Sequence, residues 1–116
     1  MGAEPFQSLN TLYYGKQASA RKDELADAVR KGKFVPGLYL ITFASNGIDQ
    51  LDILPCYAAL QKHVKKRKPV LAGICLGRQE AFETIAEMAS DAYRQTGACH
   101  LQDFLLLREA DGGSGI

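Results

Sequence analysis

The densest group of charged side chains in this 116-residue sequence is a basic cluster. Its members are Lys62, His63, Lys65, Lys66, Arg67 and Lys68. Such a cluster can contact the phosphates of a nucleic acid or of another polyanion, with binding that weakens as salt rises. It can equally be the solvated end of a helix, where the helix dipole favours each cation by about 0.3–1 kcal/mol. The cluster contains no aromatic residue for base stacking. Both interpretations stay open.

A second candidate is an anion site at Gly77 and Arg78, between a predicted strand and a predicted helix. Open α/β sheets bind anions and ligands at this position, because the first backbone N–H groups of the helix point outward there. Arg78 could add a forked pair of hydrogen bonds, as a small enzyme with an anionic substrate would need. Against this, Glu80 and Glu83 complement the helix dipole by themselves. The alternative is a structural glycine beside a solvated arginine.

The cysteines are the remaining residues that could act as a nucleophile or bind a metal ion. Cys56 follows Pro55 at the predicted start of a helix, where a thiolate would be stabilised, so Cys56 is a candidate reactive thiol. A nucleophile also needs a positioned base, and the sequence places neither His63 nor His100 beside it. The spacing of cysteine and histidine matches no zinc pattern. We therefore expect buried, inert cysteines, no catalytic residue, no metal and no cofactor.

The cellular compartment follows from the same residues. An odd number of cysteines, three in all, on apolar segments predicts reduced thiols and a cytoplasmic protein. The first six residues lack the basic and apolar regions of a signal peptide. No apolar run approaches the roughly 20 residues that span a bilayer. We expect no membrane partner.

The elements that must position these residues are clearest between Pro69 and Gly97. An unbroken apolar run predicts a strand over 70–76 with both faces buried. From Gln79 the apolar residues recur with a period of 3.6, which predicts a helix over 79–96. Its apolar face would be formed by Phe82, Ile85, Ala86, Ala89 and Tyr93. Gly73 within the strand indicates a place where a helix approaches closely.

The other elements are read from capping residues, turns and apolar runs. Residues 4–14 form either a helix or a short strand at 9–14. A helix is expected over 19–31, a strand over 38–44, and a hairpin turn at Asn46-Gly47. A more polar return strand over 48–54 has the character of a sheet edge. A helix then begins at Pro55, and the last strand covers 101–107.

These elements predict an α/β fold in one domain, residues 1–109, followed by a flexible tail at 110–116. The element order α-β-β-α-β-α-β gives a mixed sheet, with parallel βαβ units plus one antiparallel hairpin strand. Apolar side chains of these elements form the predicted core. It consists of Leu25, Val29, Leu38, Leu40, Ile41, Phe43, Ile53, Leu60, Val70, Leu71, Ile74, Leu76, Phe82, Ile85, Ala89, Leu105 and Leu107.

Two features of the whole chain bear on partners. Strands that are apolar on both faces need cover on both sides, so either the fold has three layers or a second copy covers a bare face. The charge is also uneven: residues 1–78 carry 12 Lys or Arg against 6 Asp or Glu, and residues 79–116 carry 2 against 7. Such an asymmetry can steer a polyanion to one end or set two copies head to tail.

The segment 70–77, with Glu80-Ala81 and the run 93–97, resembles small α/β proteins of Gram-positive gut bacteria. That resemblance implies no activity and assigns no site residue. We therefore expect a non-enzymatic, cytosolic protein–protein interaction or regulatory domain that forms a homodimer. The alternatives are weak polyanion binding through the basic cluster and a small enzyme with its anion site at residues 77–80.

Overall fold

A four-stranded mixed sheet forms the centre of the computed structural model, which describes residues 7–44 and 50–113. Its spatial order is β1 (Gln7–Tyr14), β4 (Val70–Leu76), β2 (Leu38–Phe43) and β3 (Leu51–Pro55). β1 runs parallel to β4, whereas β2 is antiparallel to both β4 and β3. The mixed sheet with its helices confirms the predicted α/β class. It also confirms that the return strand after residue 48 is an edge strand.

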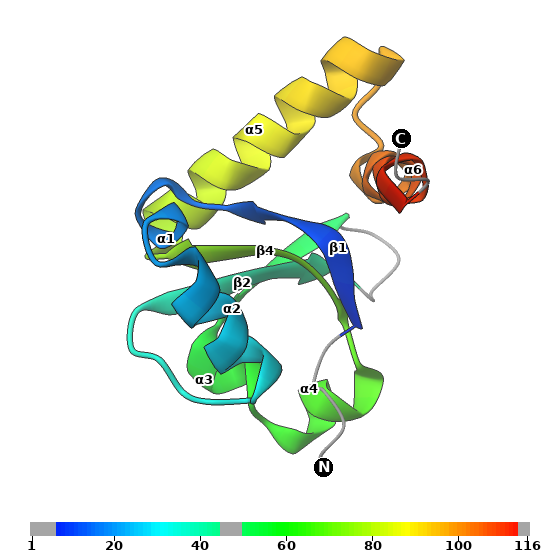
Figure 1. Ribbon diagram of the computed structural model, residues 1–116. Helices are drawn as coiled ribbons and strands as arrows, with labels where there is room; N and C mark the ends of the chain where they lie inside the picture. Colours follow the sequence, from blue (N-terminus) through cyan, green and yellow to red (C-terminus); the bar gives the residue numbers. More distant parts are fainter. Residues whose placement is uncertain (1–6, 45–49, 114–116) are drawn as a thin grey trace.

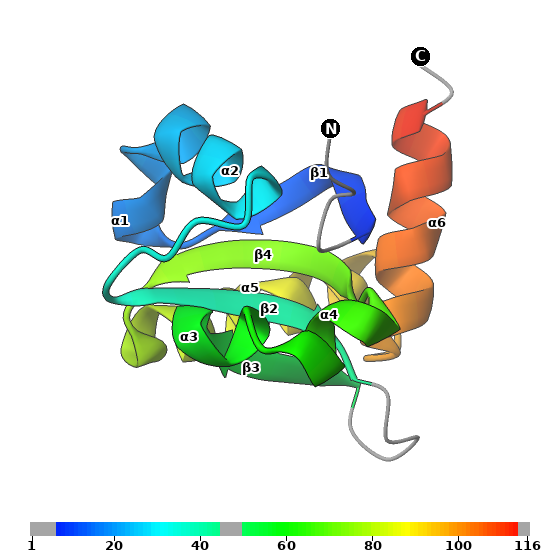
Figure 2. The same ribbon diagram turned by 90° about the horizontal axis from the view of Figure 1, so that it is seen from below.

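Helices cover both faces of the sheet (Figure 1). Leu25 and Val29 of α2 (Lys22–Arg30) and Cys56 and Ala59 of α3 (Cys56–Ala59) pack on one face. On the other face, the buried residues come from α5 (Arg78–Thr96) and α6 (Leu101–Gly113). The short helices α1 (Lys16–Ser19) and α4 (Lys62–Arg67) complete the order. The fold is therefore three-layered, and its own chain covers both sides of the sheet (Figure 2).

The central strand β4 buries both of its faces, as its continuous apolar run predicts. Leu71 and Ile74 pack in the cluster with α2 and α3, and Ala72 and Cys75 pack in the cluster with α5 and α6. The pairing of β4 with β2 shifts register next to Gly73. A methyl group on Gly73 would lie 3.3 Å from the Met88 side chain of α5. This confirms Gly73 as a place of close helix approach.

The last predicted strand, 101–107, is wrong, because this segment forms α6. Leu101, Phe104 and Leu105 are buried at helical spacing, and Leu107 is 57 % exposed although the sequence placed it in the core. A short apolar run fits a strand or a buried helix equally well. Without that strand, the sheet lacks the parallel βαβ unit expected to follow β4. β3 and β4 lie on either side of β2. Residues 110–113, predicted as tail, continue the helix.

Of the two structures predicted for the N-terminal segment, the strand is the one observed. This strand, β1, forms the edge of the sheet opposite β3. The expected helix over 19–31 is shorter and follows the separate turn of α1. It lies opposite α5 but on the same side as α3. The predicted turn at Asn46-Gly47 lies outside the described residues.

The buried face of α5 differs from the predicted one. Phe82 is 50 % exposed and Tyr93 is 64 % exposed, whereas Ala81, Thr84, Met88 and Ala92 face the sheet. Three of these four inward residues are no larger than threonine, and the fourth, Met88, is the one whose side chain reaches Gly73. Bulky Phe82 would hold the helix away from the sheet. The predicted period was right, and Ile85 and Ala89 do pack against the core, but the buried face is rotated away from Phe82 and Tyr93.

Candidate functional site

The predicted anion site at the start of α5 already holds a carboxylate of the chain itself. Glu80 is 6 % exposed, and its Oε2 accepts hydrogen bonds from the backbone N–H groups of Leu76 (2.9 Å) and Ala18 (3.2 Å). Its Oε1 accepts from the Gln17 N–H at 2.8 Å. The carboxylate thus joins the end of β4 to the first turn of α1. The sequence identified Glu80 as a partner of its own helix dipole, but missed these contacts with a segment more than sixty positions away.

Gly77 and Arg78 lie beside this carboxylate. Gly77 has a φ of 100°, and its N–H donates to the Gly37 carbonyl at 2.8 Å. Arg78 is exposed, and its guanidinium carbon lies 5.6 Å from the centre of the Phe82 ring. The N–H groups of Leu76 and Gly77 are therefore both bonded within the chain. An open cleft of about 320 Å³ between α1 and α5 is lined mainly by Glu80, Glu83, Glu87 and Lys16.

Cys56 is 5 % exposed at the start of α3. Its thiol donates to the Lys33 carbonyl at 3.7 Å and accepts from the Val35 N–H at 3.5 Å. Cys75 is buried as well, and burial raises the pKa of its thiol. Cys99, in contrast, is exposed between α5 and α6.

A small groove lies beside Cys56. We call it the aromatic groove; it is lined by Phe34, Val35, Gly37, Leu38, Tyr39, Pro55, Cys56 and Tyr57. Its volume is about 140 Å³. Phe34 and Tyr57 are 57 % and 65 % exposed. The sequence analysis did not identify it, because its residues come from a loop, two strands and a helix.

The basic cluster lies on α4 and directly after it. Lys66, Arg67 and Lys68 are exposed, and Lys68 has a φ of 46°. The side chains of Lys62, His63 and Lys65 lie outside the described part of the structure. The cluster is thus at a helix end, in the layer that also contains α2 and α3 (Figure 1). That position fits both interpretations of the sequence.

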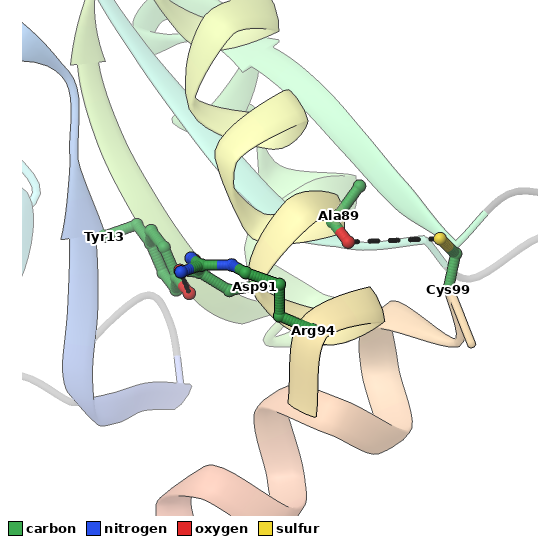
Figure 3. Close-up of polar contacts among 5 residues, drawn as sticks. All are labelled: Tyr13, Ala89, Asp91, Arg94 and Cys99. Atoms are coloured by element: carbon green, nitrogen blue, oxygen red, sulfur yellow. Dashed lines mark hydrogen bonds and ion pairs between the residues drawn. The ribbon is translucent and has the colours of Figure 1, made fainter. Parts of the chain in front are cut away.

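A polar junction between β1, α5 and α6 was not predicted. Figure 3 shows its members on β1 and α5, which are Tyr13, Asp91 and Arg94. The Tyr13 hydroxyl donates to Asp91 at 2.7 Å, and Asp91 also pairs with Arg94. The Arg108 guanidinium carbon lies 4.6 Å from the centre of the Tyr13 ring, which offsets the burial of the cation. Burial and the bond to Asp91 raise the pKa of Tyr13. Tyr13 therefore donates a hydrogen bond that ties β1 to α5, and its ring contacts Arg108 of α6. The raised pKa keeps Tyr13 protonated, so it is unsuited to act as a base.

The outer face of α6 is formed by Asp103, Leu106 and Leu107, which are all exposed. Leu106 and Leu107 are 51 % and 57 % exposed. The inner face is anchored by Leu101, Phe104 and Leu105 and by Gln102, whose amide donates to the Gln50 carbonyl at 2.6 Å. α6 therefore carries large apolar side chains on both sides.

The described residues contain neither a candidate metal site nor a membrane-spanning helix. Within 7–44 and 50–113, no three His, Cys, Asp or Glu side chains are grouped so that they could hold a metal ion. In the same part of the chain, no helix is both long and apolar enough to cross a bilayer.

Comparison of the chain with protein-family models, with curated proteins and with solved structures finds no match.

Proposed function

We propose that this protein is a non-enzymatic interaction domain that associates with further copies of itself in the cytoplasm. The observation that carries the proposal is the distribution of leucines on α6. Leu101 and Leu105 are buried against the domain, while Leu106 and Leu107 are exposed on the outer face. Exposed apolar side chains that lie together with a charged residue at their border are typical of an interaction surface. The outer face of α6 is therefore suited to be covered by a partner.

The support differs from the argument that the sequence offered. The sequence suggested a second copy because a sheet face might lack cover, but helices of the same chain cover both faces. What is left exposed is the outer side of one covering helix. The cytoplasmic location is proposed on the odd number of cysteines in the sequence.

The proposal is tested by light scattering coupled to gel filtration over a wide range of protein concentration. We expect the wild-type mass to rise with concentration toward that of a homodimer. The variant Leu106→Ser/Leu107→Ser should stay monomeric at concentrations where the wild type is paired. Tyr93→Ser is the matched control, because Tyr93 is equally exposed in the same layer but lies on α5. A wild type that is monomeric throughout would overturn the proposal.

A second candidate function is polyanion binding through the basic cluster. It is favoured by the exposure of Lys66, Arg67 and Lys68 together at the end of α4. Binding would be weakly selective and strongly salt-dependent, because it would rest on phosphate contacts alone.

A further inference from the structure

The two outer layers of the protein carry opposite charge. Residues 79–116, which contain α6 and all of α5 except its first residue, Arg78, carry 2 Lys or Arg against 7 Asp or Glu. Residues 1–78 include the helices of the other layer and carry 12 against 6. If two copies met with α6 against α6, two negative layers would face each other, and that arrangement is repulsive. A partner surface on the basic side of another copy is electrostatically favoured.

The aromatic groove is the apolar hollow on that basic side. Its volume of about 140 Å³ is well below the roughly 300–1,000 Å³ of small-molecule sites. It is thus of a size to receive one aliphatic side chain between the exposed rings of Phe34 and Tyr57. Lys33, which precedes Phe34, is exposed.

The outer face of α6 matches this groove in shape and charge. Asp103 precedes Leu106 and Leu107 by three and four positions, so the three side chains share one side of the helix. Two adjacent aliphatic side chains with one carboxylate beside them thus correspond to an apolar hollow next to the exposed Lys33.

Within one chain these two surfaces cannot meet. The groove lies where β2 begins and β3 ends, at Leu38, Tyr39 and Pro55. α6 is anchored beyond the opposite end of the same strand pair, at Ala44 and Gln50. Six residues of β2 separate the two ends by about 20 Å. Figures 1 and 2 both show α6 and α3 on opposite sides of the molecule.

We propose that Leu107, the more exposed of the two leucines, docks from one copy into the aromatic groove of the next copy, with Asp103 facing Lys33. This inference rests on the proposed self-association and names the partner surface. The contact joins two different patches, so it is head-to-tail. The first product is an asymmetric pair, and further copies add to its free ends as an open chain or a ring.

The experiment is a complementation of two variants, followed by sedimentation velocity. Leu107→Asp removes the α6 surface and keeps the groove, whereas Tyr57→Asp removes the groove surface and keeps α6. Both residues are more than half exposed, so the fold should persist; circular dichroism and thermal unfolding check this. Phe34→Asp serves as a second groove variant if Tyr57→Asp does not fold.

We expect each variant alone to associate at least about tenfold more weakly than the wild type. An equimolar mixture should form a 1:1 pair, in which the intact α6 of one variant occupies the intact groove of the other. This pair should not grow further, because the α6 surface and the groove that it leaves free are the two substituted ones. The affinity of this pair should fall as salt rises, because charges at the rim contribute to it.

Two results would overturn the inference while leaving the proposed function in place. One is a Tyr57→Asp variant that associates as strongly as the wild type, which would mean that α6 uses another surface. The other is a mixture that stays monomeric when the wild type associates. A wild type that is itself monomeric at every concentration would instead remove the proposed function together with the inference.

Discussion

The side chain of Glu80 occupies the space that a side chain at Gly15 would need. A methyl group on Gly15 would lie 2.0 Å from Oε2 of Glu80 and 2.3 Å from its carboxyl carbon. Gly15 precedes α1, whose first N–H groups bond to that carboxylate. The glycine is therefore needed for a close approach between two segments, because its φ of −64° is open to any residue.

Gly15→Ala should lower the free energy of unfolding by about 1–3 kcal/mol, the usual effect of overpacking a filled site. The measurement is urea denaturation followed by circular dichroism. Gly37→Ala is the control, because nothing lies within 4 Å of its added methyl group and only its φ of 79° is unfavourable. In the double variant Gly15→Ala/Glu80→Ala the clash is absent, so its loss should be smaller than the sum of the single losses. Strict additivity would show that the contact does not exist.

Glu80→Gln should destabilise the protein although it preserves the size of the side chain. The carboxylate accepts three backbone N–H groups, and the Gln amide would put an NH₂ group in place of one acceptor oxygen. At least one buried N–H group would then lose its partner, at a cost of about 1–3 kcal/mol. Glu83→Gln, on the exposed side of α5, is the matched control and should change stability little. Equal effects of the two substitutions would contradict the capping role of Glu80.

Stability should decline at alkaline pH because of Tyr13. Its pKa in the folded protein is raised above the ordinary value of about 10 by burial and by the bond to Asp91. The unfolded chain therefore loses the Tyr13 proton first, so the stabilising contribution is complete below about pH 10 and is lost as the pH rises further. Unfolding free energies at about pH 8 and pH 11 measure this loss.

Tyr13→Phe should weaken this pH dependence and lower stability at neutral pH, where the bond to Asp91 is lost. Part of the dependence should persist, since burial also raises the pKa of Tyr14. The idea fails if wild type and Tyr13→Phe lose stability equally between the two pH values.

The orientation of α5 can be tested by truncating one residue on each side. Met88→Ala removes a fully buried side chain and should cost about 2–5 kcal/mol. Phe82→Ala removes a larger side chain that is half exposed, and should cost much less. Thermal unfolding of the two variants compares them directly. A larger loss of stability in Phe82→Ala than in Met88→Ala would show that the face predicted from the sequence is the buried one.

The basic cluster is tested by its salt dependence. If it binds nucleic acid, the logarithm of the binding constant should fall with the logarithm of salt by about 0.9 for each duplex phosphate neutralised. Replacing Lys65, Lys66 and Lys68 by Gln should flatten this slope and change thermal stability little, since each dipole contribution is only about 0.3–1 kcal/mol. A gel-shift series at about 50 and 200 mM salt compares the two proteins. If neither shifts a probe at the lower salt, the cluster is a solvated helix end.

The sequence by itself determined the elements whose apolar pattern admits one solution. The run before Gly77 has no polar position to expose, so β4 had to be a strand buried on both faces. The period of 3.6 after Gln79 required a helix, and the charged return strand before Pro55 required an edge. These local patterns were enough for the α/β class and for the close approach at Gly73. They were not enough to choose between a strand and a helix for the apolar run at 104–107.

Tertiary structure decided the features for which the local sequence pattern fits more than one structure. Residues 101–107 became a helix because Leu101, Phe104 and Leu105 can fill the space beside β1 and α5 only at helical spacing. α5 buries Ala81, Thr84, Met88 and Ala92 rather than Phe82 and Tyr93, because the period of 3.6 alone does not fix which of two adjacent stripes faces the sheet. The contacts of Glu80 and Tyr13 join segments more than sixty positions apart, and no spacing rule encodes such contacts. The charge asymmetry was visible in the sequence, but it became a polarity across the sheet only when the chain placed α5 and α6 together on one face.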